Sequence, residues 1–134
     1  MKKVFFILSM IAAGCSPKLS PDHNWSRQRW VLTDLRGVPV QLSGTNRDAF
    51  IEFAPAEKRF SGNGGCNRIN GNYRLERKNN IRFGEVLSTK MSCADIAFEN
   101  TFLSALNAVN RYELTGNTFL MKDGKKVLLV FQSK

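Results

Sequence analysis

Two cysteines and a cluster of glycines occur close together in the middle of this 134-residue chain. The cluster is Ser61-Gly62-Asn63-Gly64-Gly65-Cys66-Asn67, and the second cysteine ends the segment Thr89-Lys90-Met91-Ser92-Cys93. Glycine adopts positive φ angles without steric cost, so the cluster predicts a tight turn between two strands. We expect a disulfide from Cys66 to Cys93 to fasten this turn to the start of a helix. The rest of the chain then has to supply strands and one helix to a single small core.

The first fourteen residues are typical of a signal peptide. Lys2 and Lys3 precede an apolar run, 4–13, that is shorter than the roughly 20 residues a helix needs to cross a bilayer. The run leads into Ala12-Ala13-Gly14-Cys15, which resembles the bacterial lipobox, with Ala12 where leucine is usual. This resemblance implies that Cys15 is acylated and becomes the first residue of the mature protein. The alternative is an ordinary secretory signal cut near Gly14, with Cys15 left as a free thiol.

The cysteine count favours a lipid on Cys15. The chain has three cysteines, and assigning Cys15 to a lipid leaves Cys66 and Cys93 as a pair. An exported protein enters an oxidising compartment, where such a pair normally forms a disulfide. The loop closed by this bond would span 93 − 66 = 27 residues. A loop of that length corresponds to about 3 to 4 kcal/mol of stabilisation when the bond acts by restricting the unfolded chain.

The chain is basic, which restricts its partners. Removing residues 1–14 takes away two lysines, so 20 − 2 = 18 basic residues stand against 11 acidic ones and the mature net charge is +7. Such a charge suits contact with an anionic lipid, a glycan or an acidic envelope protein. We expect no nucleic-acid partner, because an exported lipoprotein does not meet nucleic acid. The interleaving of aromatic and basic residues that marks a single-strand binding platform is also missing from the sequence.

Composition divides the chain into three parts. Residues 1–14 are the expected signal peptide, residues 15–28 a lipid-anchored flexible tether, and residues 29–134 one folded domain. The tether holds Pro17, Pro21 and His23 but too few apolar residues to form a core.

Alternating hydrophobicity predicts that the domain consists mostly of antiparallel strands. The clearest period of two runs from Ile69 to Glu76, where apolar or small residues alternate with polar ones. Further strands are predicted around residues 30–32, 38–42, 49–53, 81–83, 111–114, 118–121 and 126–131. Pro39 indicates an edge strand, because proline has no N–H to donate to a neighbouring strand.

One segment has helical spacing instead. After Cys93, apolar residues recur at i, i+4, i+5, i+8 and i+11, as Phe98, Phe102, Leu103, Leu106 and Val109. This stripe predicts one packed helix near residues 94–110 and therefore an α+β fold. Ser92 or Asp95 can cap the start of the helix. Asp95 and Glu99 also suit the positive end of the helix dipole.

The sequence contains no recognisable catalytic or metal-binding set. The single histidine, His23, falls in the tether, so a Ser-His-Asp or Cys-His arrangement would have to recruit it from there. Cys66 and Cys93 have no further Cys or His partners at ligand spacing. Asp95 and Glu99 have the spacing of an acid/base pair, but helix-start electrostatics explains both residues. We expect no enzyme activity, no metal site and no cofactor.

Three polar features have structural interpretations. The glycine cluster lacks the Gly-Lys-Ser or Gly-Lys-Thr ending of a phosphate-binding loop and is not followed by a helix, so we expect a turn or bulge. The nearby asparagines are expected to stabilise turns, with contact to a polar ligand as the alternative: Asn63, Asn67, Asn70 and Asn72. Five basic residues surround one predicted hairpin and form a solvated face, which could lie against anionic headgroups under a membrane anchor: Arg68, Arg74, Arg77, Lys78 and Arg82.

Short motifs in the second half of the chain carry a family resemblance. They are Gly64-Gly65-Cys66-Asn67, Gly71-Asn72-Tyr73, Thr89-Lys90-Met91-Ser92-Cys93, Phe98-Glu99, Phe102-Leu103, Leu106, and Tyr112 with Leu114. Together they resemble the META domain of HslJ-like bacterial envelope proteins, over residues 27–132. The resemblance implies a strand-rich, incomplete or cracked barrel with one packed helix, similar to secretin pilot lipoproteins. It also implies an association with heat or envelope stress, and it carries over no catalytic residues.

We therefore expect a non-catalytic, lipid-anchored envelope protein that binds a partner or stabilises the envelope under stress. The alternative is a module that binds a hydrophobic ligand such as an acyl chain, because ten phenylalanines and two tryptophans can line a cavity as well as fill a core. Ser16 is not an acidic retention signal, which by resemblance favours the outer membrane. We expect a monomer whose partners are the membrane, through Cys15, and an envelope protein or an anionic lipid or glycan.

Overall fold

The computed structural model describes Trp25 and residues 28–134, which form nine strands and one helix. The expected signal peptide, Cys15, His23 and most of the expected tether lie outside these described residues. The strands are β1 (Trp30–Leu35), β2 (Val38–Pro39), β3 (Phe50–Ala54), β4 (Arg59–Asn63), β5 (Arg68–Glu76), β6 (Asn80–Ser88), β7 (Arg111–Thr115), β8 (Thr118–Asp123) and β9 (Lys126–Ser133). The helix α1 (Ile96–Ala108) connects β6 to β7. Nothing helical in this described part is both long and apolar enough to cross a membrane.

The strands form one antiparallel sheet that closes on itself. The strand order is β2-β1-β3-β4-β5-β6-β7-β8-β9, and β9 pairs with β1 as well as with β8. Short turns join most of these neighbours, which is why alternating patterns in the sequence locate the strands well. The expected fold class, an α+β domain of mostly antiparallel strands in an incomplete barrel with one packed helix, is confirmed.

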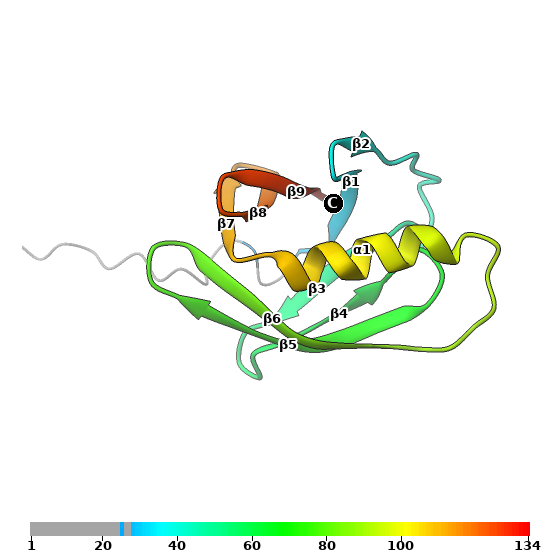
Figure 1. Cartoon of the computed structure of the whole chain (residues 1–134), viewed down its shortest axis with the longest axis horizontal. Helices are drawn as coiled ribbons and strands as arrows, with labels where there is room; N and C mark the ends of the chain where they lie inside the picture. The colour runs from blue at the N-terminus through cyan, green and yellow to red at the C-terminus, as the bar shows by residue number, and fades with distance from the viewer. Residues whose placement is uncertain (1–24, 26–27) are drawn as a thin grey trace, which may run out of the picture.

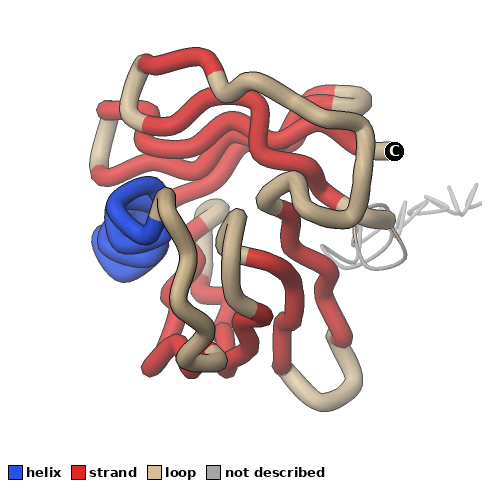
Figure 2. Tube along the Cα trace, turned by 90° about the vertical axis from the view of Figure 1, so that its right-hand side faces the viewer, coloured by secondary structure: helices blue, strands red, loops and turns tan. Residues whose placement is uncertain are grey.

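Two joints of the ring are short, and they make it irregular. β1 and β3 pair at only two positions, where Trp30–Val31 lies against Phe50–Ile51. β6 and β7 pair at a single position, Asn80 with Arg111. The sheet is therefore divided into β3 to β6 on one side and β1, β2 and β7 to β9 on the other, with α1 lying between the two groups (Figure 1). The view turned by 90° shows the same division, with the helix at one side of the opening (Figure 2).

The helix α1 packs its apolar stripe into this opening. Phe102, Ala105 and Leu106 are buried, and the helix contacts β6, β1 and β9. The predicted helix near residues 94–110 is confirmed. The predicted cap at Asp95 is not, because this residue occupies the N-cap position without a side-chain hydrogen bond to the helix. Its backbone, at φ −112° and ψ 46°, is not in the extended conformation that capping residues usually adopt.

Aromatic side chains fill the interior of the ring. Trp25 is 1% exposed, and its ring centroid lies 4.4 Å from that of Phe53 and 5.4 Å from that of Phe119. The indole N–H of Trp30 donates to the carbonyl oxygen of Trp25 at 3.0 Å. Trp25 falls within the range 15–28 that was expected to be a flexible tether, but its large apolar ring packs in the core with these aromatic neighbours.

The segment after β1 departs from the predicted strand at residues 38–42. Only Val38–Pro39 pairs with β1, and residues 40–49 form a loop. Pro39 lies at the sheet edge, as predicted, opposite Asp34. The chain leaves the sheet here, and the loop bends through a positive φ of 75° at Gly44.

Candidate functional site

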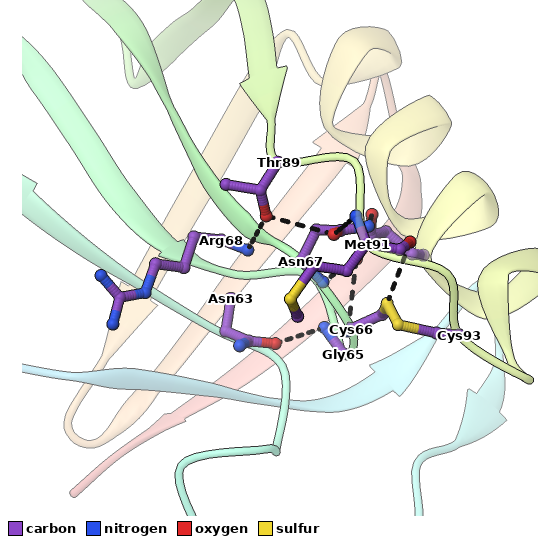
Figure 3. The surroundings of a disulfide bond; sticks show 9 residues. Asn63, Gly65, Cys66, Asn67, Arg68, Thr89, Met91 and Cys93 are labelled. Atoms are coloured by element: carbon purple, nitrogen blue, oxygen red, sulfur yellow. Dashed lines mark hydrogen bonds between the residues drawn. A yellow bond between two sulfur atoms is a disulfide. The ribbon is translucent and has the colours of Figure 1, made fainter.

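The motifs singled out in the sequence meet at the side chain of Asn67, which is 2% exposed. Its Oδ1 accepts a hydrogen bond from the backbone N–H of Met91 at 2.7 Å and one from the hydroxyl of Thr89 at 3.1 Å. These donors lie 24 and 22 residues further along the chain. Figure 3 shows Asn67 beside Thr89 and Met91, next to the linked sulfurs of Cys66 and Cys93. Asn67 therefore joins the glycine turn to the segment that precedes α1.

Glu99, on the first turns of α1, completes this arrangement. Its Oε2 accepts from the backbone N–H of Asn67 at 2.6 Å and from that of Cys66 at 3.2 Å. Its Oε1 accepts from the side-chain amide of Asn67 at 2.8 Å. Glu99 lies in the first turn of α1, where its charge suits the helix dipole as expected, but its side chain is only 2% exposed and therefore buried. Three donors compensate for the loss of water around the carboxylate.

The glycines of the turn allow this close approach. A Cβ atom on Gly64 would lie 2.6 Å from Oε2 of Glu99, a distance that real Cβ contacts do not show. Gly65 has φ +104°, which disfavours any other residue, and a Cβ there would lie 2.9 Å from the ring of Phe98. Asn63 accepts from the N–H of Gly65 at 2.7 Å, so it stabilises the turn as predicted. The glycine cluster thus serves packing against α1.

A disulfide joins Cys66 to Cys93, whose Cα atoms are 6.1 Å apart. This is the pair that the cysteine count predicted. The bond lies beside the Asn67–Met91 hydrogen bond, so the turn and the segment before α1 are linked covalently as well as by hydrogen bonds (Figure 3). We call Asn67, Thr89, Glu99 and the Cys66–Cys93 disulfide the Asn67 cluster.

An open groove of about 600 Å³ lies beside the Asn67 cluster. It runs between the β1–β2 turn, the 40–49 loop and the first half of α1, and Gly65 contributes to its lining. Half of the residues that line it have apolar side chains: Leu35, Val38, Pro39, Val40, Ala49, Ala97 and Phe98. Val38 is 65% exposed, which is unusual for a valine in a paired strand. A concave, mostly apolar surface with a few charges is the usual form of a binding site.

The groove has charged groups of both signs at its margin, namely Arg36, Arg47, Asp48 and Asp95. Asp48 forms hydrogen bonds within the 40–49 loop. Its Oδ1 accepts from the N–H and the hydroxyl of Ser43 at 2.7 and 2.8 Å, and its Oδ2 accepts from the N–H of Gly44 at 2.8 Å. Burial acts to raise the pKa of Asp48, but these hydrogen bonds and the charge of Lys134 outweigh it, so the pKa is lowered. The ionised carboxylate thereby holds the 40–49 loop.

The other candidate residues lie apart from the Asn67 cluster or on its margin. Asp95 is exposed at the groove while Glu99 is buried against Asn67, so the two carboxylates do not act as a pair. No group of three His, Cys, Asp or Glu residues within the described part of the chain is arranged to hold a metal ion. Asn70 and Asn72 accept hydrogen bonds from Arg59 on the outer face of the sheet.

One feature of the sequence predicts the burial of Glu99 in the Asn67 cluster. Glu99 precedes Phe102 by three residues and Leu106 by seven, so it lies on the apolar stripe of α1. A carboxylate on that stripe predicts a buried charge with donors opposite to it. Which donors these are depends on tertiary contacts.

Fold and site together define a small, disulfide-linked domain in which a ring of strands and one helix frame a surface groove. The chain belongs to the META domain family, which it matches over residues 23–134. Among curated proteins, no match to the chain is found.

Solved structures share this fold. An NMR structure of a protein from Burkholderia xenovorans superposes with a TM-score of 0.67 at 20% identity, over 82% of this chain and 83% of that one. A second NMR structure has a TM-score of 0.61 at 26% identity, over 80% and 89% of the two chains. The crystal structure of a DUF4847 family protein from Bacteroides vulgatus has a TM-score of 0.59 at 18% identity, over 83% and 95%.

Proposed function

We propose that this META domain protein is a non-catalytic, lipid-anchored protein of the cell envelope that binds an apolar segment of a partner protein. Cys15 would carry the lipid, the outer membrane would be its location, and its role would belong to the response to envelope stress. The observation that carries the binding proposal is the apolar groove between the β1–β2 turn and α1.

The construction of the groove supports binding there. On the side of α1, Phe98 and Gly65 are held by the Asn67 cluster, because Glu99 and Cys66 are their neighbours in sequence. On the opposite side, three hydrogen bonds to Asp48 hold the loop. A surface held in place before binding loses less conformational entropy when a ligand arrives.

The alternative of an acyl chain held inside the barrel has less support. The position such a chain would need is occupied by Trp25, whose ring packs within 6 Å, centroid to centroid, of Phe53, Tyr73, Tyr112 and Phe119. We therefore assign ligand binding to the groove.

Photo-crosslinking in intact cells tests the proposal. A photoreactive amino acid at Val38, which is 65% exposed in the groove, should give a discrete protein adduct. The same amino acid at Leu87, which is 55% exposed on β6 and does not line the groove, is the matched control and should not give that adduct.

A second pair of variants tests whether the groove itself is responsible. Ala97→Asp places a charge on the exposed groove side of α1 and should abolish the Val38 adduct, whereas Ser104→Asp, also exposed on α1 but outside the groove, should leave it unchanged. Equal adducts from Val38 and Leu87, or no effect of Ala97→Asp, would contradict groove binding. Turnover of an envelope substrate by the purified protein, lost on mutation of a surface cluster, would contradict the non-catalytic part.

A further inference from the structure

Several turns of the chain lie close together at the end of the molecule where β6 pairs with β7. Asn80 of β6 pairs with Arg111 of β7, and Arg111 pairs with Lys122 of β8. The β8–β9 turn is tied to the same place, because Asn110 accepts from the N–H of Gly124 at 2.8 Å. In Figure 1 the β5–β6 hairpin, the start of β7 and the β8–β9 turn all lie at the left.

This end carries most of the net charge of the described residues. Segments 74–82 and 111–126 contain eight basic and three acidic side chains, a net charge of 8 − 3 = +5. The rest of the described chain also has eight basic side chains but seven acidic ones, a net charge of 8 − 7 = +1. We call the two segments the basic end; its charged residues are Arg74, Arg77, Lys78, Arg82, Arg111, Lys122, Lys125 and Lys126, with Glu76, Glu113 and Asp123.

Most of the positive charges at the basic end face solvent without an acidic partner. Two pairs are formed, Arg74 with Glu76 at 2.9 Å and Lys122 with Glu113 at 2.7 Å. The other six basic residues form no ion pair among the described residues and are exposed: Arg77, Lys78, Arg82, Arg111, Lys125 and Lys126. Three of these lie in hairpin turns, Arg77 and Lys78 between β5 and β6 and Lys125 between β8 and β9. The earlier expectation of one basic cluster from Arg68 to Arg82 needs correction, because Arg68 lies at the opposite end of β5, paired with Asn63.

The first described residue, Trp25, packs in the core against two tyrosines that adjoin residues of the basic end. The ring of Trp25 lies 5.8 Å from that of Tyr73 and 5.9 Å from that of Tyr112, measured between centroids. These tyrosines are the sequence neighbours of Arg74 and Arg111. Cys15 precedes Trp25 by 25 − 15 = 10 residues, a length that reaches at most about 35 Å when extended. A domain held by a lipid on Cys15 would thus be kept within that distance of the bilayer.

We propose that the basic end is a docking surface for an anionic phospholipid bilayer. Because β2 and the start of α1, which border the groove, lie at the other side of the molecule in Figure 1, this docking would orient the groove away from the membrane. The orientation rests on the proposed lipid anchor, whereas the affinity for anionic headgroups does not. Lysine and arginine near such a surface are attracted by its negative potential, and the attraction extends only about a Debye length. The charges therefore contribute only when this end faces the lipid.

Vesicle co-sedimentation tests the affinity without the anchor. The probe protein is the chain from residue 15 onward with Cys15→Ser, which has no site for a lipid. It should bind vesicles of 30% phosphatidylglycerol in phosphatidylcholine at least about 10-fold more strongly than pure phosphatidylcholine vesicles in low salt. The variant Arg77→Gln/Lys78→Gln/Lys125→Gln/Lys126→Gln should lose on the order of 100-fold in partitioning onto the anionic vesicles.

The matched control removes four exposed charges outside the basic end, as Arg47→Gln/Arg59→Gln/Arg68→Gln/Lys90→Gln. It should retain most of the partitioning, although its net charge falls by the same amount. Thermal unfolding of both variants checks that they fold. The proposal is overturned if the parent does not prefer anionic vesicles, or if the control loses as much binding as the basic-end variant. Failure of the lipid anchor would appear separately, in the fractionation of Cys15→Ala, and would leave this result unchanged.

Discussion

At the scale of single residues, two buried polar side chains hold the domain together. Glu99 and Asn67 are each 2% exposed, and together they take part in five hydrogen bonds. Three of these join the glycine turn to α1, and two join Asn67 to the segment before α1. Apolar residues could fill the same volume. They could not accept hydrogen bonds from the backbone N–H groups of Cys66 and Asn67 in the turn and of Met91 in the segment before α1.

Glu99→Gln should therefore destabilise the domain by about 2 kcal/mol. The substitution keeps the shape of the side chain but places an N–H₂ group where one carboxylate oxygen accepts, so a donor of the turn loses its partner. Urea denaturation followed by circular dichroism measures the change. Glu113→Gln, whose side chain is 55% exposed in its ion pair with Lys122, is the control and should cost less than about 0.5 kcal/mol. Equal effects of the two variants would show that Glu99 is not a structural acceptor.

Asp48 makes the stability of the 40–49 loop dependent on pH. Its pKa is lowered by the hydrogen bonds from Ser43 and Gly44 and by Lys134, in spite of burial. A lowered pKa means that the carboxylate stabilises the fold at pH values above its ordinary pKa of about 3.9, and that this contribution is lost as the pH falls through the lower pKa of the folded state.

Asp48→Asn should accordingly reduce stability at pH 7 by about 1 to 2 kcal/mol, because one of the three donors then faces an amide N–H₂ group. The difference from the parent should shrink as the pH is lowered below 4. Urea denaturation of both proteins at several pH values between 3 and 7 measures it. A difference that stays constant over this range would mean that the charge of Asp48 contributes nothing.

At the scale of elements, the glycine turn and α1 form one unit. The turn between β4 and β5 is closed by one backbone hydrogen bond, from the N–H of Gly64 to the carbonyl oxygen of Asn67 at 2.8 Å. It is also held by α1 through Glu99, and by the segment before α1 through Asn67 and the disulfide. Gly64 and Gly65 let the backbone approach α1 closely enough for these bonds. The groove lies against this unit, so its shape depends on the same contacts.

We expect Cys66→Ser and Cys93→Ser to destabilise the domain by similar amounts, about 3 to 4 kcal/mol for a separation of 27 residues. The double variant should be no worse than either single one, since all three lack the same bond. Urea denaturation of the four proteins, with the parent in reducing buffer as a further control, completes the cycle. Additive losses would instead point to two independent contributions from the thiols.

At the scale of the whole molecule, few strand pairs close the ring at its two short joints, and packing in the core holds the two sides together. β6 and β7 share one paired position, while Trp25 packs between the two sides against Phe53 and Phe119. The charge distribution is also a property of the whole molecule, because the basic end combines turns that are distant in sequence.

Cys15→Ala tests the proposed anchor at this scale. The variant should lose metabolic labelling with palmitate, and the domain should be released from the membrane fraction or remain unprocessed. Two or more acyl chains suffice for stable membrane residence, at about 0.8 kcal/mol for each buried methylene group. Cys66→Ser serves as the control for a missing cysteine and should remain labelled. Normal processing and membrane fractionation of Cys15→Ala would contradict the lipoprotein proposal.

Local periodicity was enough to locate the strands and α1, because alternation and helical spacing report which face of each element is buried. The disulfide followed from counting cysteines. The burial of Trp25 and of Glu99 was not predicted, for a common reason: it is decided by partners far along the chain, Phe119 for the tryptophan and the N–H groups of Cys66 and Asn67 for the carboxylate. The groove and the basic end are likewise decided by the tertiary structure. Closing the ring brings the β1–β2 turn next to α1 and the β5–β6 hairpin next to the β8–β9 turn.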